Sequence, residues 1–119
     1  MKIYIATPVN ARREGTLEEK RKAAYKRIEY LFCELYKTYK EKVMYSSFDN
    51  DIAPIHVPEE SLMPEANIMG KCVQRVMECD AILMDWGYEN SKGCTIEHTT
   101  ALTYGKKIIH AYDLGIEPE

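Results

Sequence analysis

The polar loop behind a strongly apolar run contains the side chains best suited to chemistry. The run AILMDW (81–86) leads into GYENSKG, and Glu97 follows four residues after Gly93. Ser91 offers a hydroxyl, Gly93 lets the backbone approach a ligand closely, and the next amides lie at the start of a predicted helix. These features predict a phosphate-binding loop, although an ordinary helix N-cap formed by Ser91 or Asn90 explains them equally well.

Glu97 is the residue of this segment with the clearest chemical use. We expect it in the first turn of a helix over roughly residues 94–104, where the helix dipole favours an ionised carboxylate by roughly 0.3–1 kcal/mol. Beside a sugar phosphate, an ionised carboxylate can attack the anomeric carbon or stabilise an oxocarbenium-like state while water attacks. Glutamates are also common in the first turn of helices that have no catalytic role.

The elements that must position these residues alternate along the chain. Apolar runs typical of strands lie at 2–6, 42–48, 81–86 and 108–112, and helical periodicity lies between them. The first helix is predicted from a capping box, Thr16 with Glu19, and from an apolar stripe of Ala24, Ile28, Leu31 and Leu35. A helix over 65–78 is predicted from Met69, Val73, Val76 and Met77, and Gly105 is expected at the C′ position of the third helix.

This order predicts an α/β fold. We expect a single domain over residues 1–119, a flavodoxin- or Rossmann-like three-layer sandwich with a mostly parallel sheet of four to five strands. Ligands of such folds bind outside the carboxyl ends of the strands, whereas Asp80 and Lys106 belong to the opposite edge, where a structural role is expected for Asp80. The predicted functional edge gathers Thr7, Arg12, Arg13, Asp49, Asp51, Asp85, Trp86, Asn90, Ser91 and Glu97.

Other residues at this edge each allow two interpretations. Arg12 and Arg13 have the fork geometry to clamp a phosphate, or they are inert exposed arginines. Trp86 and Tyr88 either stack on a nucleobase or cover the end of the sheet. Cys94 lies where a helix N-terminus lowers a thiol pKa, but the sequence shows no paired base for it.

Composition excludes several classes of partner. The 119 residues are 45% apolar and 29% charged, with a formal net charge of −3, which favours neither a nucleic-acid polymer nor an anionic membrane. No apolar run approaches the length of a membrane span, and the start MKIYIATPV is too short for a signal peptide, so we expect a cytoplasmic protein. The scattered cysteines and histidines predict no metal site. Lys20, Lys22, Lys26 and Arg27 are expected to form a solvated helix surface.

Three segments together resemble the nucleoside 2-deoxyribosyltransferase superfamily. They are KIYIATP (2–8), CDAILMDW (79–86) and SKGCTIEHTTALTYGKKII (91–109), and the specific motifs cover about residues 80–109. The stretch WGYENSKGCTIEHTTALTYGK is most similar to an uncharacterised bacterial and phage branch of that superfamily. The resemblance implies cleavage of an N-glycosidic bond, or deoxyribosyl transfer, on a nucleoside or its 5′-monophosphate.

The resemblance also implies roles for individual residues. Glu97 occupies the position of the nucleophile, and Tyr4 that of the first-strand tyrosine of the transferases. Ser91 stands where the transferases have an aspartate, and in this it resembles the 2′-deoxynucleoside 5′-monophosphate N-glycosidases, whose serine contacts the phosphate. The first-loop arginine of those hydrolases falls on Arg12 or Arg13. No cofactor is implied, because cleavage by a carboxylate needs none, and related enzymes suggest a homodimer or higher homo-oligomer.

One departure from the family pattern concerns the second catalytic carboxylate. The superfamily usually has an aspartate where this chain has Cys72. The pair of carboxylates is therefore incomplete unless Asp85, Asp49 or Asp51 substitutes, and we take Asp85 as the second catalytic candidate beside Glu97. The alternative is a non-catalytic module of the same fold that binds a nucleotide or sugar phosphate.

Overall fold

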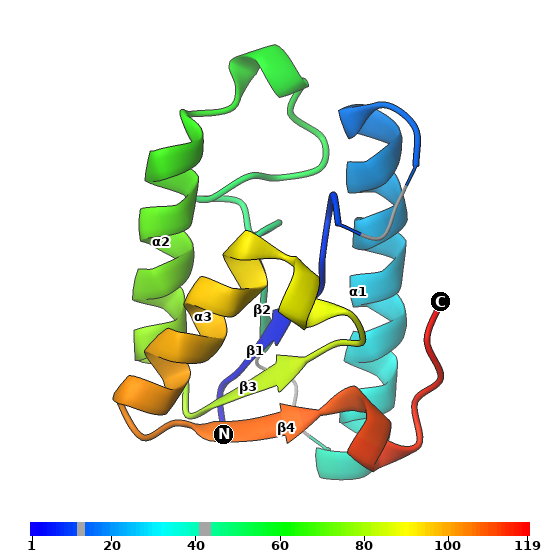
Figure 1. Ribbon diagram of the computed structural model, residues 1–119, viewed down its shortest axis with the longest axis vertical. Coiled ribbons are helices and arrows are strands. Elements are labelled where there is room, and N and C mark those ends of the chain that lie inside the picture. Colours follow the sequence, from blue (N-terminus) through cyan, green and yellow to red (C-terminus); the bar gives the residue numbers. More distant parts are fainter. Residues whose placement is uncertain (12–13, 41–43) are drawn as a thin grey trace.

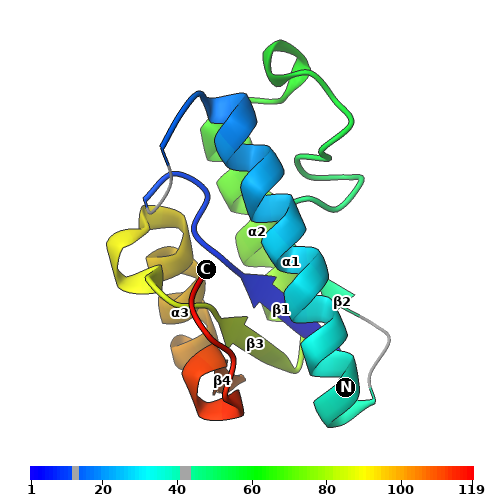
Figure 2. The ribbon, with the colours of Figure 1, turned by 90° about the vertical axis from the view of Figure 1, so that its right-hand side faces the viewer.

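The protein is a three-layer α/β sandwich. The computed structural model describes residues 1–11, 14–40 and 44–119. Within them, four parallel strands form a sheet in the order β2-β1-β3-β4. Helix α1 covers one face of this sheet, and α2 and α3 cover the other (Figures 1 and 2). The strands are β1 (Ile3–Ala6), β2 (Met44–Tyr45), β3 (Ala81–Met84) and β4 (Lys107–His110), and the helices are α1 (Leu17–Tyr39), α2 (Glu65–Glu78) and α3 (Lys92–Thr103). The predicted flavodoxin-like fold is confirmed, with four strands that are all parallel.

Alternating side chains of the central strands build a core on each face of the sheet. Ile3 and Ile5 of β1 pack under α1, whereas Tyr4 and Ala6 face α2 and α3. Strand β3 is buried throughout and divides its side chains in the same way. Side chains alternate along a strand, so one residue of register decides which of two separate interiors a group enters.

Helix α1 begins and packs as predicted. The Thr16 hydroxyl accepts the Glu19 amide at 3.2 Å, and Glu19 accepts the Thr16 amide at 3.1 Å, which completes the capping box. The predicted apolar stripe is buried. Arg27 differs from the prediction of a solvated surface, because only 7% of it is exposed. It lies three residues after Ala24 and one before Ile28, on the edge of the buried stripe.

The other helices show smaller differences from the predictions. Helix α2 has the predicted bounds, but Cys72 and Val76 are its buried residues while Met77 is 41% exposed. Helix α3 begins at Lys92, two residues earlier than predicted, and this moves Glu97 into the second turn. Gly105 follows α3 with a positive φ of 66°, as its predicted C′ position requires.

The connecting segments are partly ordered by short 3₁₀ turns. The loop before α2 contains η1 (Glu59–Ser61), the loop after β3 contains η2 (Tyr88–Asn90), and η3 (Ala111–Leu114) follows β4. At the opposite edge of the sheet, the Lys2 amide donates to Asp80 at 2.7 Å, which gives Asp80 the structural contact expected of it. Among the described residues, no helix is both long and apolar enough to span a membrane.

Candidate active site

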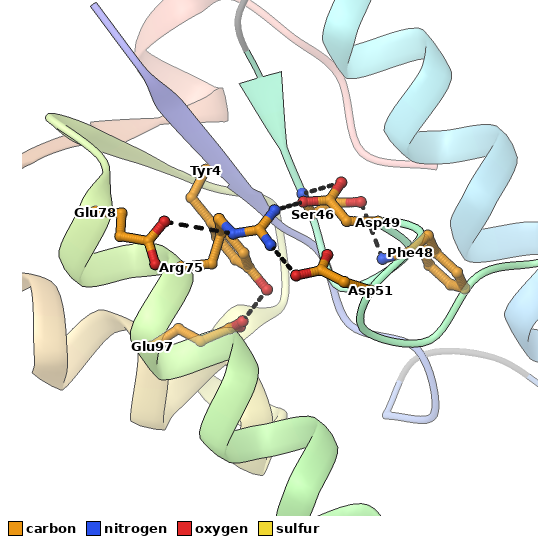
Figure 3. Close-up of polar contacts among 8 residues, drawn as sticks. All are labelled: Tyr4, Ser46, Phe48, Asp49, Asp51, Arg75, Glu78 and Glu97. Carbon is orange, nitrogen blue, oxygen red and sulfur yellow. Dashed lines mark hydrogen bonds and ion pairs between the residues drawn. The ribbon is translucent and has the colours of Figure 1, made fainter. Parts of the chain in front are cut away.

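Glu97 lies in the interior between the sheet and helices α2 and α3. Ser91 caps α3 by accepting the Cys94 amide at 3.3 Å, and Glu97 lies on the buried side of this helix with Cys94 and Ala101. Tyr4 of β1 donates its hydroxyl to Glu97 Oε2 (Figure 3). Glu97 is only 5% exposed and Tyr4 only 1%. The hydroxyl therefore holds one carboxylate oxygen in a fixed position within a nearly dry interior.

The environment of Glu97 favours its neutral form. Burial raises the pKa of Glu97 to about 7, and the hydrogen bond from Tyr4 opposes this rise only in part. Our expectation of a first-turn glutamate held ionised by the helix dipole is therefore wrong. Glu97 lies beyond the first turn, where the dipole effect has fallen off, and the loss of water around the carboxylate dominates.

Cys72 of α2 is the third member of this group. A side-chain hydrogen bond joins its thiol to Tyr4, and Cys72 is 3% exposed. Burial, followed by the nearby carboxylate of Glu97, raises the pKa of Cys72 to about 12, so the thiol is neutral. Tyr4 is thus surrounded by a carboxyl group from α3 and a thiol from α2. Burial and then Glu97 raise the pKa of Tyr4 well above its usual value, which keeps the phenol protonated.

Asp85 lies on the α1 side of the sheet. It accepts the Thr7 hydroxyl at 2.6 Å and both Nε and a terminal nitrogen of Arg27, at 3.0 and 2.9 Å. Burial opposes ionisation of Asp85, but the hydrogen bonds from Arg27 and Thr7 outweigh it and lower the pKa. This geometry does not support the catalytic role expected of Asp85, nor a substrate contact by Thr7. We assign both to the connection between α1 and β3.

Trp86 also packs on the α1 side of the sheet. Its indole N–H donates to the Ile116 carbonyl at 2.6 Å. Its ring packs edge-on against the Tyr112 ring, with the two ring centroids 5.7 Å apart. Arg27 donates to the Glu117 carbonyl at 2.7 Å. Trp86 therefore covers the end of the sheet and holds the C-terminal segment, which is the second of its two predicted interpretations.

The loop between β3 and α3 contains the N-cap that was one of its two predicted interpretations. Ser91 makes the capping bond described above, and Asn90 is exposed at the end of η2. A Cβ on Gly93 would meet only the Met69 sulfur, at 3.7 Å, so packing does not require glycine there. Gly87, which the sequence analysis did not single out, has a φ of 79° and turns the chain out of β3. Arg12 and Arg13 lie outside the described residues.

A cluster of charged residues lies on the same face as Glu97, and it joins two predicted edge residues, Asp49 and Asp51, to an arginine that sequence reasoning missed. Arg75 of α2 pairs with Asp49 and Asp51 of the loop after β2, and its guanidinium lies 4.9 Å from the centre of the Tyr45 ring. Figure 3 shows this cluster together with Tyr4 and Glu97. The available signal was the spacing of Cys72 and Arg75, which are three residues apart on a helix and therefore share a face.

Comparison with known proteins gives the family and the fold. A family model described as a domain of unknown function, DUF4406, matches residues 1–110. The chain belongs to the DUF4406 family. No curated protein matches it.

Two solved structures share the fold of this DUF4406 protein. The CMP N-glycosidase BcmB of Clostridium botulinum is 22% identical over 92% of this chain and 67% of its own, with a TM-score of 0.55. A 2-desoxiribosyltransferase from Leishmania mexicana is 22% identical over 99% of this chain and 73% of its own, with a TM-score of 0.56. The resemblance to the nucleoside 2-deoxyribosyltransferase superfamily is thereby confirmed at the level of the fold.

The DUF4406 chain brings only part of the predicted site together. Tyr4 and Glu97 are in direct contact, and Cys72 joins them. Thr7 and Asp85 are bonded to each other on the other face of the sheet. The structure thus holds one nearly dry carboxylate with a phenol donor, and separates it from the carboxylate that sequence reasoning had paired with it.

Proposed function

We propose that this protein cleaves the N-glycosidic bond of a (deoxy)nucleoside or its 5′-monophosphate, or transfers the deoxyribosyl group, with Glu97 as nucleophile. The observation that carries the proposal is the buried Glu97 with the Tyr4 hydroxyl on its Oε2. A nucleophilic carboxylate must be held still and kept from bulk water, and this contact supplies the orientation.

The proposed reaction runs in two steps. Ionised Glu97 attacks C1′ while the C1′–N bond breaks and its electron pair leaves with the base. Water, or a second base, then attacks C1′, gives up a proton and releases the carboxylate, while the departed base has taken up a proton, so that the overall reaction is balanced. Tyr4 keeps Oε2 in place through both steps, because its raised pKa leaves the phenol protonated. Ser91 and the amides that begin α3 are the proposed contacts for a 5′-phosphate, with Arg12 or Arg13 from the first loop.

Release of free base tests this proposal. The purified protein is incubated with the common deoxynucleosides and their 5′-monophosphates, and the free base is resolved by chromatography. We expect base from the wild type and a loss of at least about a hundredfold in Glu97→Gln, which keeps the shape of the side chain but is a far weaker nucleophile. Glu89→Gln, an exposed change in the loop before α3, is the matched control and retains activity. Equal rates for Glu97→Gln and wild type would exclude the nucleophile role.

The second candidate is a binding module without catalysis. Among the described residues, Asp85 and Glu97 are the only buried carboxylates, and Asp85 is bonded to Arg27 and Thr7. Cys72 contributes a neutral thiol beside Tyr4 instead of a second acid. This candidate predicts that a nucleotide raises the melting temperature of the wild type while no base appears. Base release that depends on Glu97 rejects it.

A further inference from the structure

We propose that Asp49, Asp51 and Arg75, here called the base-reading cluster, select substrates whose base carries an exocyclic amino group. The inference rests on the proposed function, since it assigns the substrate's base to one side of Glu97. The proposed preference is for cytosine and adenine over uracil and hypoxanthine, which carry a carbonyl oxygen in place of the amino group.

The position of the cluster follows from strand register and from α2. Tyr4 and Tyr45 are register partners on adjacent strands, and Arg75 lies over the Tyr45 ring. Cys72, three residues before Arg75, contacts Tyr4. The carboxylates of Glu97 and Asp49 both raise the pKa of the Cys72 thiol, so the proposed nucleophile and the cluster both lie near this thiol. A sugar at Glu97 can therefore point its base towards the cluster.

The cluster presents hydrogen-bond acceptors. One terminal nitrogen of Arg75 donates to Asp49 and the other to Asp51, while its Nε lies 3.9 Å from Glu78 (Figure 3). Both terminal nitrogens of the guanidinium are therefore engaged by the two aspartates. A carboxylate accepts about four hydrogen bonds, so Asp49 and Asp51 retain acceptor capacity. The Asp51 side chain is 56% exposed, which leaves it accessible to a ligand.

Charge points to the same class of base. Two carboxylates and one guanidinium leave the cluster with one net negative charge, which favours a cation beside it. Cytosine and adenine gain a proton on a ring nitrogen next to the amino group, and the two N–H groups then match one carboxylate bidentately. Uracil and hypoxanthine present a carbonyl oxygen in place of the amino group, and this oxygen is repelled by the carboxylates.

The same contact would assist bond cleavage. The ring-protonated base takes up the electron pair of the breaking C1′–N bond and leaves as a neutral molecule, while Glu97 forms its bond to C1′. The proton on the ring nitrogen comes from solvent before cleavage. The positive charge of the base and the negative charge of Glu97 are both neutralised when the C1′–N bond breaks and the ester bond forms. The same hydrogen bonds from the protonated base to the cluster would therefore select the base and make it a better leaving group.

Matched substrates test the inference. Deoxycytidine and deoxyuridine 5′-monophosphates differ by an amino group and a carbonyl, as do the deoxyadenosine and deoxyinosine pair. We expect kcat/KM for base release to favour the amino member of each pair by about tenfold or more. Asp51→Asn should bring both ratios towards one, because it removes the charge. Glu78→Gln is the control. The Glu78 side chain is 54% exposed and lies near Arg75 on the same helix, α2. The kcat/KM ratios of this variant should stay at the wild-type values.

The outcomes separate this inference from the proposed function. Base release with ratios near one, or in favour of the keto bases, overturns the inference and leaves the function standing. A preference for amino bases that survives in Asp51→Asn overturns the role of the cluster. If no substrate releases base, the function is wrong, and calorimetric dissociation constants for the same pairs decide the inference: tighter binding of the amino members that depends on Asp51 supports it, and equal or absent binding rejects it.

Discussion

Two buried carboxylates in this protein show how surroundings decide ionisation at the scale of a residue. Burial opposes the ionisation of both Asp85 and Glu97. Asp85 is compensated by Arg27 and Thr7, and its pKa is lowered. Glu97 has the Tyr4 hydroxyl, which does not offset burial, and its pKa rises to about 7. A buried acid with a raised pKa at the ligand-binding edge is a feature of functional sites. A buried carboxylate that is paired with an arginine, such as Asp85, has a structural role instead.

The raised pKa of Glu97 predicts a pH dependence of stability. Between the ordinary value of 4.5 and about 7, the unfolded chain has lost the proton while the folded chain keeps it. The contribution of Glu97 to the free energy of unfolding therefore falls by up to roughly 3 kcal/mol as pH rises through this window. Above the window this contribution stays constant. Glu97→Gln cannot ionise, so we expect it to be more stable than the wild type at pH 8 and similar to it near pH 4.5. Urea unfolding at both pH values measures this; a less stable variant at pH 8 contradicts it.

Tyr4 predicts a shift of the activity profile. Its hydrogen bond lowers the pKa of Glu97 against the effect of burial. Tyr4→Phe removes the donor, so the acid limb of kcat/KM for base release should move to higher pH than in the wild type. Tyr25→Phe, on the α1 side of the sheet, is the control and should keep the wild-type limb. An unchanged acid limb in Tyr4→Phe would show that Glu97 does not set the profile.

At the scale of elements, the Arg27–Asp85 ion pair joins α1 to the end of β3. Its two side chains are 6% and 0% exposed. The C-terminal segment is attached to the same point through the Glu117 carbonyl. The pair thus holds α1, β3 and the C-terminal segment together, on the side of the sheet away from Glu97.

Removing one charge of this pair should destabilise the fold. Asp85→Asn leaves the Arg27 guanidinium buried without its counter-charge, and we expect a loss of about 3–5 kcal/mol in the free energy of unfolding. Lys22→Ala, which removes an exposed pair with Glu18, should cost less than about 1 kcal/mol. Urea unfolding at pH 7 compares the two. An Asp85→Asn variant as stable as Lys22→Ala would reject the structural role assigned to Asp85.

At the scale of the whole molecule, the order of the strands sets where the sheet is firmest. Strand β1 pairs with β2 on one side and with β3 on the other, and β3 pairs with β4. Strand β2 consists of two half-buried residues at the edge of the sheet. The Tyr4–Glu97 contact is thus anchored on a central strand, whereas the base-reading cluster depends on a loop behind the edge strand.

Amide hydrogen exchange should reflect this difference. We expect the slowest exchange in β1 and β3, because their amides are buried on both faces of the sheet, and faster exchange at Met44 and Tyr45. Exchange measured by NMR checks the order. Protection of β2 equal to that of β1 would show that the edge strand opens only with the whole sheet.

Local patterns in the sequence determined the elements and the class of fold. The capping box of Thr16 and Glu19, the buried stripe of α1 and the glycine after α3 each depend on residues a few positions apart. Strands that alternate with helices favour a parallel sheet with crossover connections, so the class of architecture could be predicted from their order. The ends of the strands, and the start of α3, were less well predicted because apolar runs do not mark where hydrogen bonding stops.

Only the tertiary structure decided which polar groups are buried together. Tyr4 and Glu97 are 93 positions apart, and Arg27 and Asp85 are 58 apart. Asp85 was predicted as catalytic and Arg27 as solvated, because sequence spacing says nothing about partners at such separations. Burial raises or lowers a pKa through water excluded by all the neighbouring segments at once. The sequence by itself therefore determined where a carboxylate stands along the chain, and the packing of β1, α2 and α3 decided that Glu97 is the one kept from water.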